Sequence, residues 1–591
     1  MHKLIEKTIE KIENAPIGFL TGAVSFLSII AIRVLVENWL EKFRSNTGLF
    51  LFYEFTHTFL FFFIAYILFA FLLGKFTRTE WKKVSNILLF GYLIIITPPL
   101  LDHVISGGSG FWSFYKFDSL LGLFQRFVTF FGDKPEIGIT FGVRIEVAIS
   151  LIFIFIYSQI KLSSQEKQIL YLNAKSKLKT ENHKILFIRI LGALWNLEFG
   201  NFRVNKKIRV LFKSLTIAFA AYIIFFTLGV FPSWITIGVS GFSKGFLNVN
   251  DINIAQMFLS PASIFSRQIP DMTSSLNIKM SIFYSLVLSG LILAILFFNF
   301  RQKFLSFLDN FRFPQVIYHS GLLLVGLGLS LKLNQSYFDM DIFNLAGLLL
   351  LLEAVLLAWL ASVVVNDFFD KKIDLQTNNH RPLIQNTFTE NEYRTLGITL
   401  FLFSLLFSAI VNFKAAFFIL AYQGITWLYS AWPLRLKRFA FVSTFIGSIA
   451  SLMIVFSGFI LASPSESIRQ LPFSVIVLLV TAYTFSLPVK DFKDIDGDKN
   501  DGVYTIPVLF GENWGKIIVA SGIFFSFLLS VAVFNEFRLF WWAMFFGGFS
   551  FWLVSNMQKE NGAVTYRNIF WWILGTIFCY CLIFAYIIVK N

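Results

Sequence analysis

The sequence predicts an all-α polytopic membrane protein with about 15 transmembrane helices. Apolar runs of roughly 18 residues or more recur along the whole chain, and each is long enough to cross a bilayer as a helix. Only 14% of the 591 residues are charged, whereas a soluble chain carries about a quarter. The basic residues, which give a net charge of +15, fall mainly between the apolar runs, as they do in the loops of membrane proteins.

The apolar runs form two series separated by a short basic connection. The first series predicts about six spans, at 17–40, 49–74, 85–104, 138–160, 214–235 and 279–300. The second predicts about nine, at 317–333, 342–365, 395–411, 414–431, 441–462, 471–488, 516–534, 539–557 and 569–589. Because the polar stretch RQKFLSFLDNFRFPQ lies between them, we expect an N-terminal membrane domain over 1–304 and a second membrane domain over 305–591.

The distribution of Lys and Arg predicts the orientation of the chain. The segment 161–213 is rich in both residues, so the positive-inside bias assigns it to the cytoplasmic side. Counting spans outward from it puts the N-terminus and the later basic loops on the same side. The sequence therefore predicts a multi-pass protein of the cell or inner membrane. Since the positive charge follows this topology, we expect no nucleic-acid partner.

Two acidic clusters stand at predicted cytoplasmic helix ends in the second series. The first contains Asp367, Asp370 and Asp374, and the second contains Asp491, Asp494 and Asp498. Both have the spacing i, i+3, i+7, which on a helix places three carboxylates on one face. One such cluster alone is typical of a solvated helix end. Two matched clusters on one side of the membrane favour a functional site, because carboxylates at membrane-helix ends are costly and usually functional.

Two facing acidic clusters would repel each other unless a cation neutralised them. Mg²⁺ is a hard cation that binds carboxylate and phosphate oxygens, so a diphosphate held through Mg²⁺ is the natural ligand. Basic side chains near the clusters could complete the anion site; they include Arg381, Arg435, Lys437 and Lys490.

These motifs resemble the UbiA superfamily of intramembrane prenyltransferases. NDFFDKKID, beginning at Asn366, is similar to the family's first aspartate motif, and NNHRPL follows it with the expected Arg-Pro pair. KDFKDIDGDKNDGVYTIPVLFG resembles the second motif, and LYSAWPLRLKR resembles an intervening element in which Trp432 stands where proline is common. The resemblance covers roughly residues 305–591.

The resemblance implies a nine-helix bundle with a lipid-open cavity capped by the two aspartate motifs. It implies that the six aspartates are catalytic and hold two Mg²⁺ ions, with Asp367, Asp370 and Asp374 on one ion and Asp491, Asp494 and Asp498 on the other. It further implies that Asn366, Arg381, Arg435, Lys437 and Lys490 bind the diphosphate. Tyr429 is then expected to line the reacting centre.

The predicted activity is Mg²⁺-dependent transfer of a prenyl group from a prenyl diphosphate to an acceptor within the membrane. The acceptor could be an aromatic quinone precursor or a polar lipid. One alternative is a terpene cyclase on the same scaffold, in which the cation is quenched inside one substrate. Another is a transport or lipid-binding protein whose aspartates only coordinate a cation.

No family resemblance is evident in residues 1–300, but six polar residues there fall near one predicted membrane face. They are Glu54, His57, Asp102, His103, Arg144 and Glu146. A second active site, a metal site or a transport gate would each bring them together. Interfacial side chains that reach water or pair for packing are the alternative explanation.

Overall fold

The computed structural model is almost entirely helical. It describes residues 2–40, 48–107, 115, 117–131, 140–173, 206–335, 339–378, 381–500, 502–559 and 562–589. Within these residues, 14 helices are long and apolar enough to cross a membrane. The predicted fold class, an all-α multi-pass membrane protein with about 15 spans, is confirmed. The predicted span at 414–431 forms helix α18 (Phe413–Ser430), which is not among the 14.

The chain folds into two compact units. Unit 1 contains Met1–Pro261 and Pro270–Tyr284, and unit 2 contains Ala262–Ile269 and Ser285–Asn591. The predicted functional domains at 1–304 and 305–591 stay predictions, because compact packing alone does not define them.

Unit 1 is built mainly from long apolar helices. Its elements are α1 (His2–Glu13), α2 (Phe19–Leu40), α3 (Gly48–Thr77), α4 (Trp81–Gly91), η1 (Tyr92–Ile96), α5 (Thr97–Ile105), α6 (Leu120–Val128), α7 (Phe141–Asn173), α9 (Lys206–Gly229), α10 (Phe231–Lys244), α11 (Asp251–Leu259) and the first half of α12 (Met272–Asn299). The amphipathic α1 is anchored at its end by Glu13, which accepts a hydrogen bond from Tyr157 Oη at 2.8 Å and pairs with Lys161.

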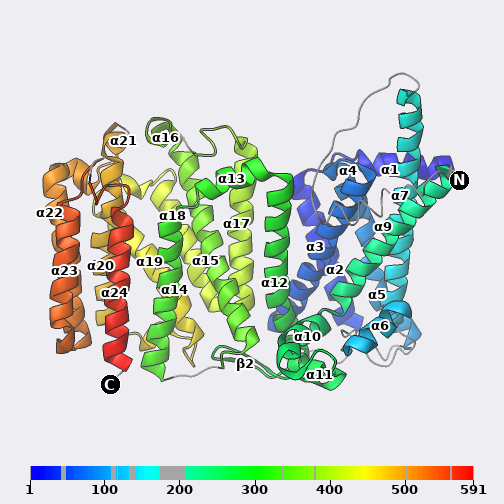
Figure 1. Cartoon of the computed structure of the whole chain (residues 1–591), viewed down its shortest axis with the longest axis horizontal. Coiled ribbons are helices and arrows are strands. Elements are labelled where there is room, and N and C mark those ends of the chain that lie inside the picture. Colours follow the sequence, from blue (N-terminus) through cyan, green and yellow to red (C-terminus); the bar gives the residue numbers. More distant parts are fainter. Residues whose placement is uncertain are drawn as a thin grey trace. The chain divides into compact units, whose positions relative to one another are not determined.

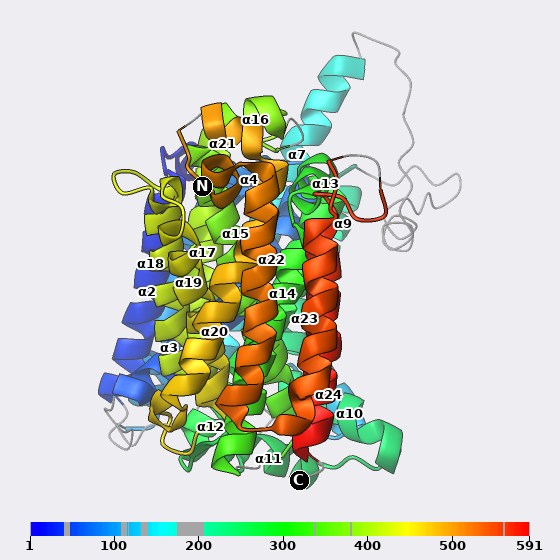
Figure 2. The same ribbon diagram turned by 90° about the vertical axis from the view of Figure 1, so that its left-hand side faces the viewer.

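Unit 2 is a bundle of parallel and antiparallel helices, which Figures 1 and 2 show side by side. Its elements are α13 (Arg301–Asp309), α14 (Phe313–Asn334), α15 (Ile342–Phe369), α16 (Lys371–Thr377), α17 (Glu390–Val411), α18, η2 (Leu436–Arg438), α19 (Val442–Leu461), η3 (Ile468–Gln470), α20 (Phe473–Ser486), η4 (Leu487–Lys493), α21 (Ile495–Asn500), α22 (Ile506–Phe534), η5 (Phe537–Leu539), α23 (Phe540–Ser555) and α24 (Ile569–Val589).

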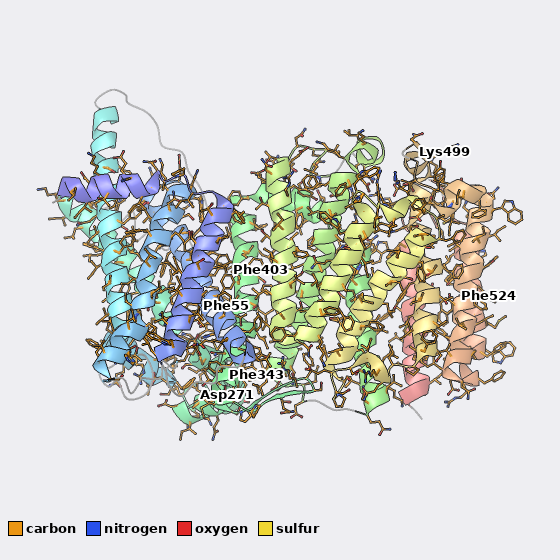
Figure 3. The ribbon with its side chains drawn as sticks, turned by 180° about the vertical axis from the view of Figure 1, so that it is seen from behind. Phe55, Asp271, Phe343, Phe403, Lys499 and Phe524 are labelled. Atoms are coloured by element: carbon orange, nitrogen blue, oxygen red, sulfur yellow. The ribbon has the colours of Figure 1, made fainter. Side chains whose placement is uncertain are left out.

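The short helices α16 and α21 lie next to each other at one end of this bundle (Figures 1 and 2). Figure 3 shows Lys499 of α21 at that end and Phe343, near the start of α15, at the opposite end of unit 2. Because α16 and α21 carry the last aspartates of the two acidic motifs, the fold brings the two motifs to the same end of the bundle.

A two-stranded hairpin contributed by the sequence before α12 belongs to unit 2. Strands β1 (Ala262–Ile264) and β2 (Arg267–Ile269) pair antiparallel, with Ala262 opposite Ile269. The Phe265 N–H at the turn donates to Asn344 Oδ1 at 2.7 Å, and Ser266 Oγ donates to the Leu461 carbonyl at 2.8 Å. The hairpin thereby connects the start of α15 to the end of α19.

Helices α14 and α19 cross with their backbones in direct contact. A Cβ added to Gly326 would overlap the Val455 carbonyl oxygen, and one added to Gly458 would overlap the Leu323 carbonyl oxygen. Small residues at such crossings allow the close backbone approach that packs membrane helices. This crossing fixes α14, which begins beside the acidic motifs.

We expect Gly326→Ala to lower the free energy of unfolding by about 2 kcal/mol, because the methyl group must push two helices apart. Gly328→Ala on the same helix is the matched control, since nothing lies within 4 Å of a Cβ there. Thermal unfolding of the purified protein in detergent measures both. Equal midpoints for the two variants would contradict the close crossing.

Candidate functional site

The first acidic motif spans a helix break. Helix α15 ends at Phe369, Asp370 is its C-cap with φ −100° and ψ 8°, and the separate helix α16 begins at Lys371. The expectation that the three carboxylates share one face of a continuous helix is therefore wrong. The break allows Asp367, Asp370 and Asp374 to meet different partners.

Asp367 lies at the centre of a buried polar cluster and is 1% exposed. Its carboxylate accepts hydrogen bonds from Asn310 Nδ2 at 2.6 Å and Tyr393 Oη at 2.8 Å. Arg312 Nη2 lies 3.3 Å from its other oxygen. No local signal in the sequence marks these three partners, because they come from the end of α13, the start of α14 and helix α17, far from the motif in sequence.

Asp370 and Asp374 are neutralised by cations from two further loops. Asp370 pairs with Arg435 Nη2 at 3.2 Å and with Lys437 Nζ. Asp374 accepts from Asn378 at 2.9 Å, and Arg381 Nε lies 3.9 Å from it. Three basic residues predicted near the diphosphate thus contact the first motif directly.

The second motif is also broken, so the single-face expectation is wrong here as well. The 3₁₀-helix η4 contains Asp491, Asp494 is its C-cap, and α21 carries Asp498. Asp494 pairs with Lys493 at 3.7 Å. Asp496 is exposed and pairs with Lys559 at 3.2 Å.

The charge of Lys437 acts on one carboxylate of each motif. Its Nζ donates to Asp370, and its charge lowers the pKa of Asp498. Burial, reinforced by the charges of Asp491 and Asp494, nevertheless raises the pKa of Asp498 to about 8. Burial also raises the pKa of Asp374 to about 6, against the opposing effect of Arg381. Burial therefore disfavours the ionised form of these two carboxylates where the motifs meet.

A divalent cation would oppose this effect of burial, because its charge favours the ionised carboxylates. In the described residues no group of three or more Asp, Glu, His or Cys side chains already converges as a metal site. The carboxylates of the first motif instead contact cations and amides of the chain. Carboxylates remain the oxygen donors that Mg²⁺ prefers, so the residue types fit the ion.

A cavity of about 150 Å³ opens beside the two motifs. Its polar end is lined by Arg312, Asn366, Tyr429, Lys490 and Asp491. Ser430 Oγ donates to Asn366 Oδ1 at 3.3 Å, and Lys490 Nζ lies 5.5 Å from the centre of the Tyr429 ring. Four predicted site residues thus line one cavity.

Aromatic side chains and one histidine line the rest of this cavity. Tyr318, Trp359, Tyr422 and Phe570 contribute rings. The His319 ring stacks on Trp359 with centroids 4.7 Å apart, and its Nδ1 lies 2.7 Å from the Gln315 carbonyl oxygen. Since a carbonyl only accepts, neutral His319 carries its proton on Nδ1, and Nε2 accepts from Tyr422 Oη at 3.1 Å.

The buried guanidinium nitrogens near the motifs include two that have no hydrogen-bond partner within the described part of the chain. They are Nε of Arg312 and Nε of Arg381. Buried N–H groups are almost always paired in folded proteins. An anion with several oxygen acceptors, such as a diphosphate, would satisfy them.

The six residues noted in the N-terminal half are only partly brought together. Glu54, His57 and Glu146 line one cavity of unit 1. Asp102 caps α7 instead, since its carboxylate accepts from the Gly142 N–H at 2.7 Å and from Thr140. His103 and Arg144 are not among the residues that line this cavity.

Comparison with known proteins matches residues 338–587 to the UbiA prenyltransferase family. A digeranylgeranylglyceryl phosphate synthase of Thermococcus sibiricus is 28% identical over 170 residues, which cover 29% of this chain and 57% of the relative. A chlorophyll synthase of Avena sativa is 29% identical over 170 residues, which cover 27% of this chain and 43% of that protein. The chain thus spans about half the length of these relatives.

Among solved structures, a UbiA homologue of Archaeoglobus fulgidus bound to GPP and Mg²⁺ aligns with a TM-score of 0.38 and 16% identity. The alignment covers 48% of this chain and 100% of that protein. The family match begins after Asn310 and Arg312 and includes both acidic motifs. Over residues 338–587, this chain is therefore similar to the UbiA prenyltransferase family.

Proposed function

We propose that unit 2 transfers a prenyl group from a prenyl diphosphate to a lipophilic acceptor within the membrane, in a Mg²⁺-dependent reaction. The observation that carries this proposal is the meeting of both acidic motifs, Lys437 and the polar end of one aromatic cavity. The catalytic part is the proposed domain 305–591, since Arg312 before the family match contributes to the site.

The cations around the motifs would bind the diphosphate. Arg312 and Arg381 each have a buried Nε that makes no hydrogen bond in the described structure, and Lys490 lines the cavity beside Asp491. Guanidinium and ammonium groups stabilise the charge that develops on a departing diphosphate. Arg435 and Lys437, now paired with Asp370, would be shared between this carboxylate and the anion.

The six aspartates of the two motifs would hold Mg²⁺. When bound, the ion would neutralise phosphate and carboxylate charge and so favour departure of the diphosphate. Burial raises the pKa of Asp498 to about 8, and a nearby divalent cation would favour its ionised form. Asn366 lines the cavity next to the first motif and would orient the prenyl diphosphate there.

The aromatic cavity would hold the prenyl chain and exclude water from the reacting carbon. Exclusion matters because water would capture an allylic cation, and aromatic faces stabilise such a cation. Tyr429, at the polar end of the cavity, would face the reacting carbon. The fold alone does not identify the acceptor. Similarity to a relative named digeranylgeranylglyceryl phosphate synthase leads us to favour a polar lipid with a hydroxyl group over an aromatic ring as the acceptor.

In such a transfer, the bond from the prenyl C1 to the diphosphate oxygen breaks and a bond from C1 to the acceptor oxygen forms. The acceptor must then lose its hydroxyl proton. His319 lines the cavity with an unprotonated Nε2 that accepts from Tyr422 Oη, so we propose that it takes this proton when the acceptor hydroxyl replaces that of Tyr422. The basic loops support a cytoplasmic N-terminus and cytoplasmic aspartate motifs, in a cell or inner membrane.

Asp367→Asn and Asp491→Asn should each lower pyrophosphate release at least about 100-fold, because each removes a charge from the proposed metal and diphosphate site. The assay uses purified protein, labelled prenyl diphosphates of several lengths and a lipid extract, with Mg²⁺ or with EDTA. Wild-type release should disappear with EDTA.

Asp496→Asn is the matched control for this test. Asp496 belongs to the same motif but is exposed and pairs with Lys559, so its loss should leave release unchanged. A comparable loss in Asp496→Asn, or release that EDTA does not affect, would contradict the proposed site. A cyclic product formed without acceptor would instead indicate a cyclase.

His319→Gln should slow transfer to the acceptor about 10- to 100-fold while leaving prenyl diphosphate affinity unchanged, because the side chain acts on the acceptor's proton. Single-turnover rates with the identified acceptor, together with equilibrium binding of a labelled prenyl diphosphate, measure the two effects separately. Tyr422→Phe removes only the hydroxyl that donates to Nε2 and should retain most activity. Unchanged transfer in His319→Gln would exclude His319 as the proton acceptor.

A further inference from the structure

Unit 1 contains a cavity of about 150 Å³ that the proposed prenyl transfer does not use. It lies where α2 ends and where α3, α7 and α12 begin. Its wall carries the titratable residues Arg33, Glu37, Glu54, His57, Tyr115 and Glu146. Three carboxylates and one guanidinium therefore face the same space between apolar helices, where charged groups are rare and usually functional.

Arg33 forms ion pairs with two of these carboxylates. Its Nη1 lies 3.7 Å from Glu146 Oε2, and its Nε lies 3.9 Å from Glu37 Oε2. It also donates to the Ile95 carbonyl, and its guanidinium carbon lies 5.3 Å from the centre of the Phe62 ring. This arrangement shows that the cavity wall accommodates a cation between carboxylates and an aromatic face.

Two buried polar side chains of this cavity have unused hydrogen-bonding capacity. Glu146 is 3% exposed, and its contact in the described residues is the 3.7 Å ion pair with Arg33 rather than a hydrogen bond. Asn277 is 6% exposed, and no hydrogen bond to its side chain is found across the described ranges. Both line the cavity. Because buried polar groups are usually hydrogen-bonded, a ligand with N–H donors could use this remaining capacity.

The side chains that line the cavity indicate which kind of ligand it would bind. Carboxylates in an apolar environment favour a cation with N–H donors, which supplies both charge and hydrogen bonds. Phe61, Phe62 and Phe225 also line the cavity, and aromatic faces attract organic cations.

We propose that this cavity binds a primary ammonium group, with Glu146 as the anchoring carboxylate and Asn277 as an additional acceptor. The ammonium could belong to a free small amine or to the headgroup of an aminophospholipid such as phosphatidylethanolamine. Both sources present the same three N–H donors. The proposal concerns unit 1 alone and holds whether or not unit 2 transfers prenyl groups.

Radiolabelled ethanolamine tests the free-amine source, with the full chain purified in detergent. Wild type should bind it saturably, and Glu146→Gln should weaken binding at least about tenfold, because a charge-assisted hydrogen bond is lost with little change in shape. Glu80→Gln, an exposed glutamate outside the cavity, is the matched control and should bind like wild type.

Nanodiscs test the lipid source. The protein is reconstituted in phosphatidylcholine containing a minor fraction of phosphatidylethanolamine, extracted again, and the co-purified lipids are counted by mass spectrometry. Retention of phosphatidylethanolamine by wild type and its loss in Glu146→Gln support a lipid headgroup. Saturable ethanolamine binding without such retention supports a free amine.

Absence of both ethanolamine binding and lipid retention in folded wild type would overturn the proposal. Equal binding by Glu146→Gln and wild type would also overturn it. Asn277→Leu provides a second variant if Glu146→Gln does not fold, since leucine removes the amide and fills the space. It should weaken binding as well, and unchanged binding would again exclude the site.

Discussion

The neutralisation of buried carboxylates is the constraint on which the site in unit 2 depends. Asp367 and Asp374 are 1% and 5% exposed, in a protein whose surroundings offer little water. An unpaired ionised carboxylate in such a place is very costly. Every aspartate of the first motif is accordingly bound to a guanidinium, an ammonium or an amide from another element.

This requirement shapes the backbone around the motifs. Helix α15 ends at Asp370, which frees the following turn to carry Asp374 towards Arg381. The loop before η2 takes a left-handed conformation at Arg435, with φ 42°, and delivers Arg435 and Lys437 to Asp370. The tight crossing of α14 and α19 then holds Arg312, at the start of α14, next to Asp367. Local irregularity and close helix packing therefore serve the same charge cluster.

Unit 1 meets the same constraint with different residues. Asp102 is satisfied within the fold, because it caps α7 through the Gly142 N–H and Thr140. Glu146 is only partly satisfied, through Arg33 at 3.7 Å. A carboxylate that the fold fully satisfies has a structural role, whereas one that faces a cavity with spare capacity can bind a ligand. This difference separates residues that the sequence alone presents as equivalent.

The sequence by itself determined the helical membrane fold, the approximate spans and the identity of both acidic motifs. These depend on the length of apolar runs and on the spacing of charged residues, which are local properties. It did not reveal the helix breaks at Asp370 and Asp494, because the same spacing also fits a continuous helix. Asn310, Arg312, Tyr393 and His319 have no local signal and became site residues only through packing. Tertiary structure decided these partners because ion pairs and cavities form between segments distant in the chain, and no periodicity records which segments meet.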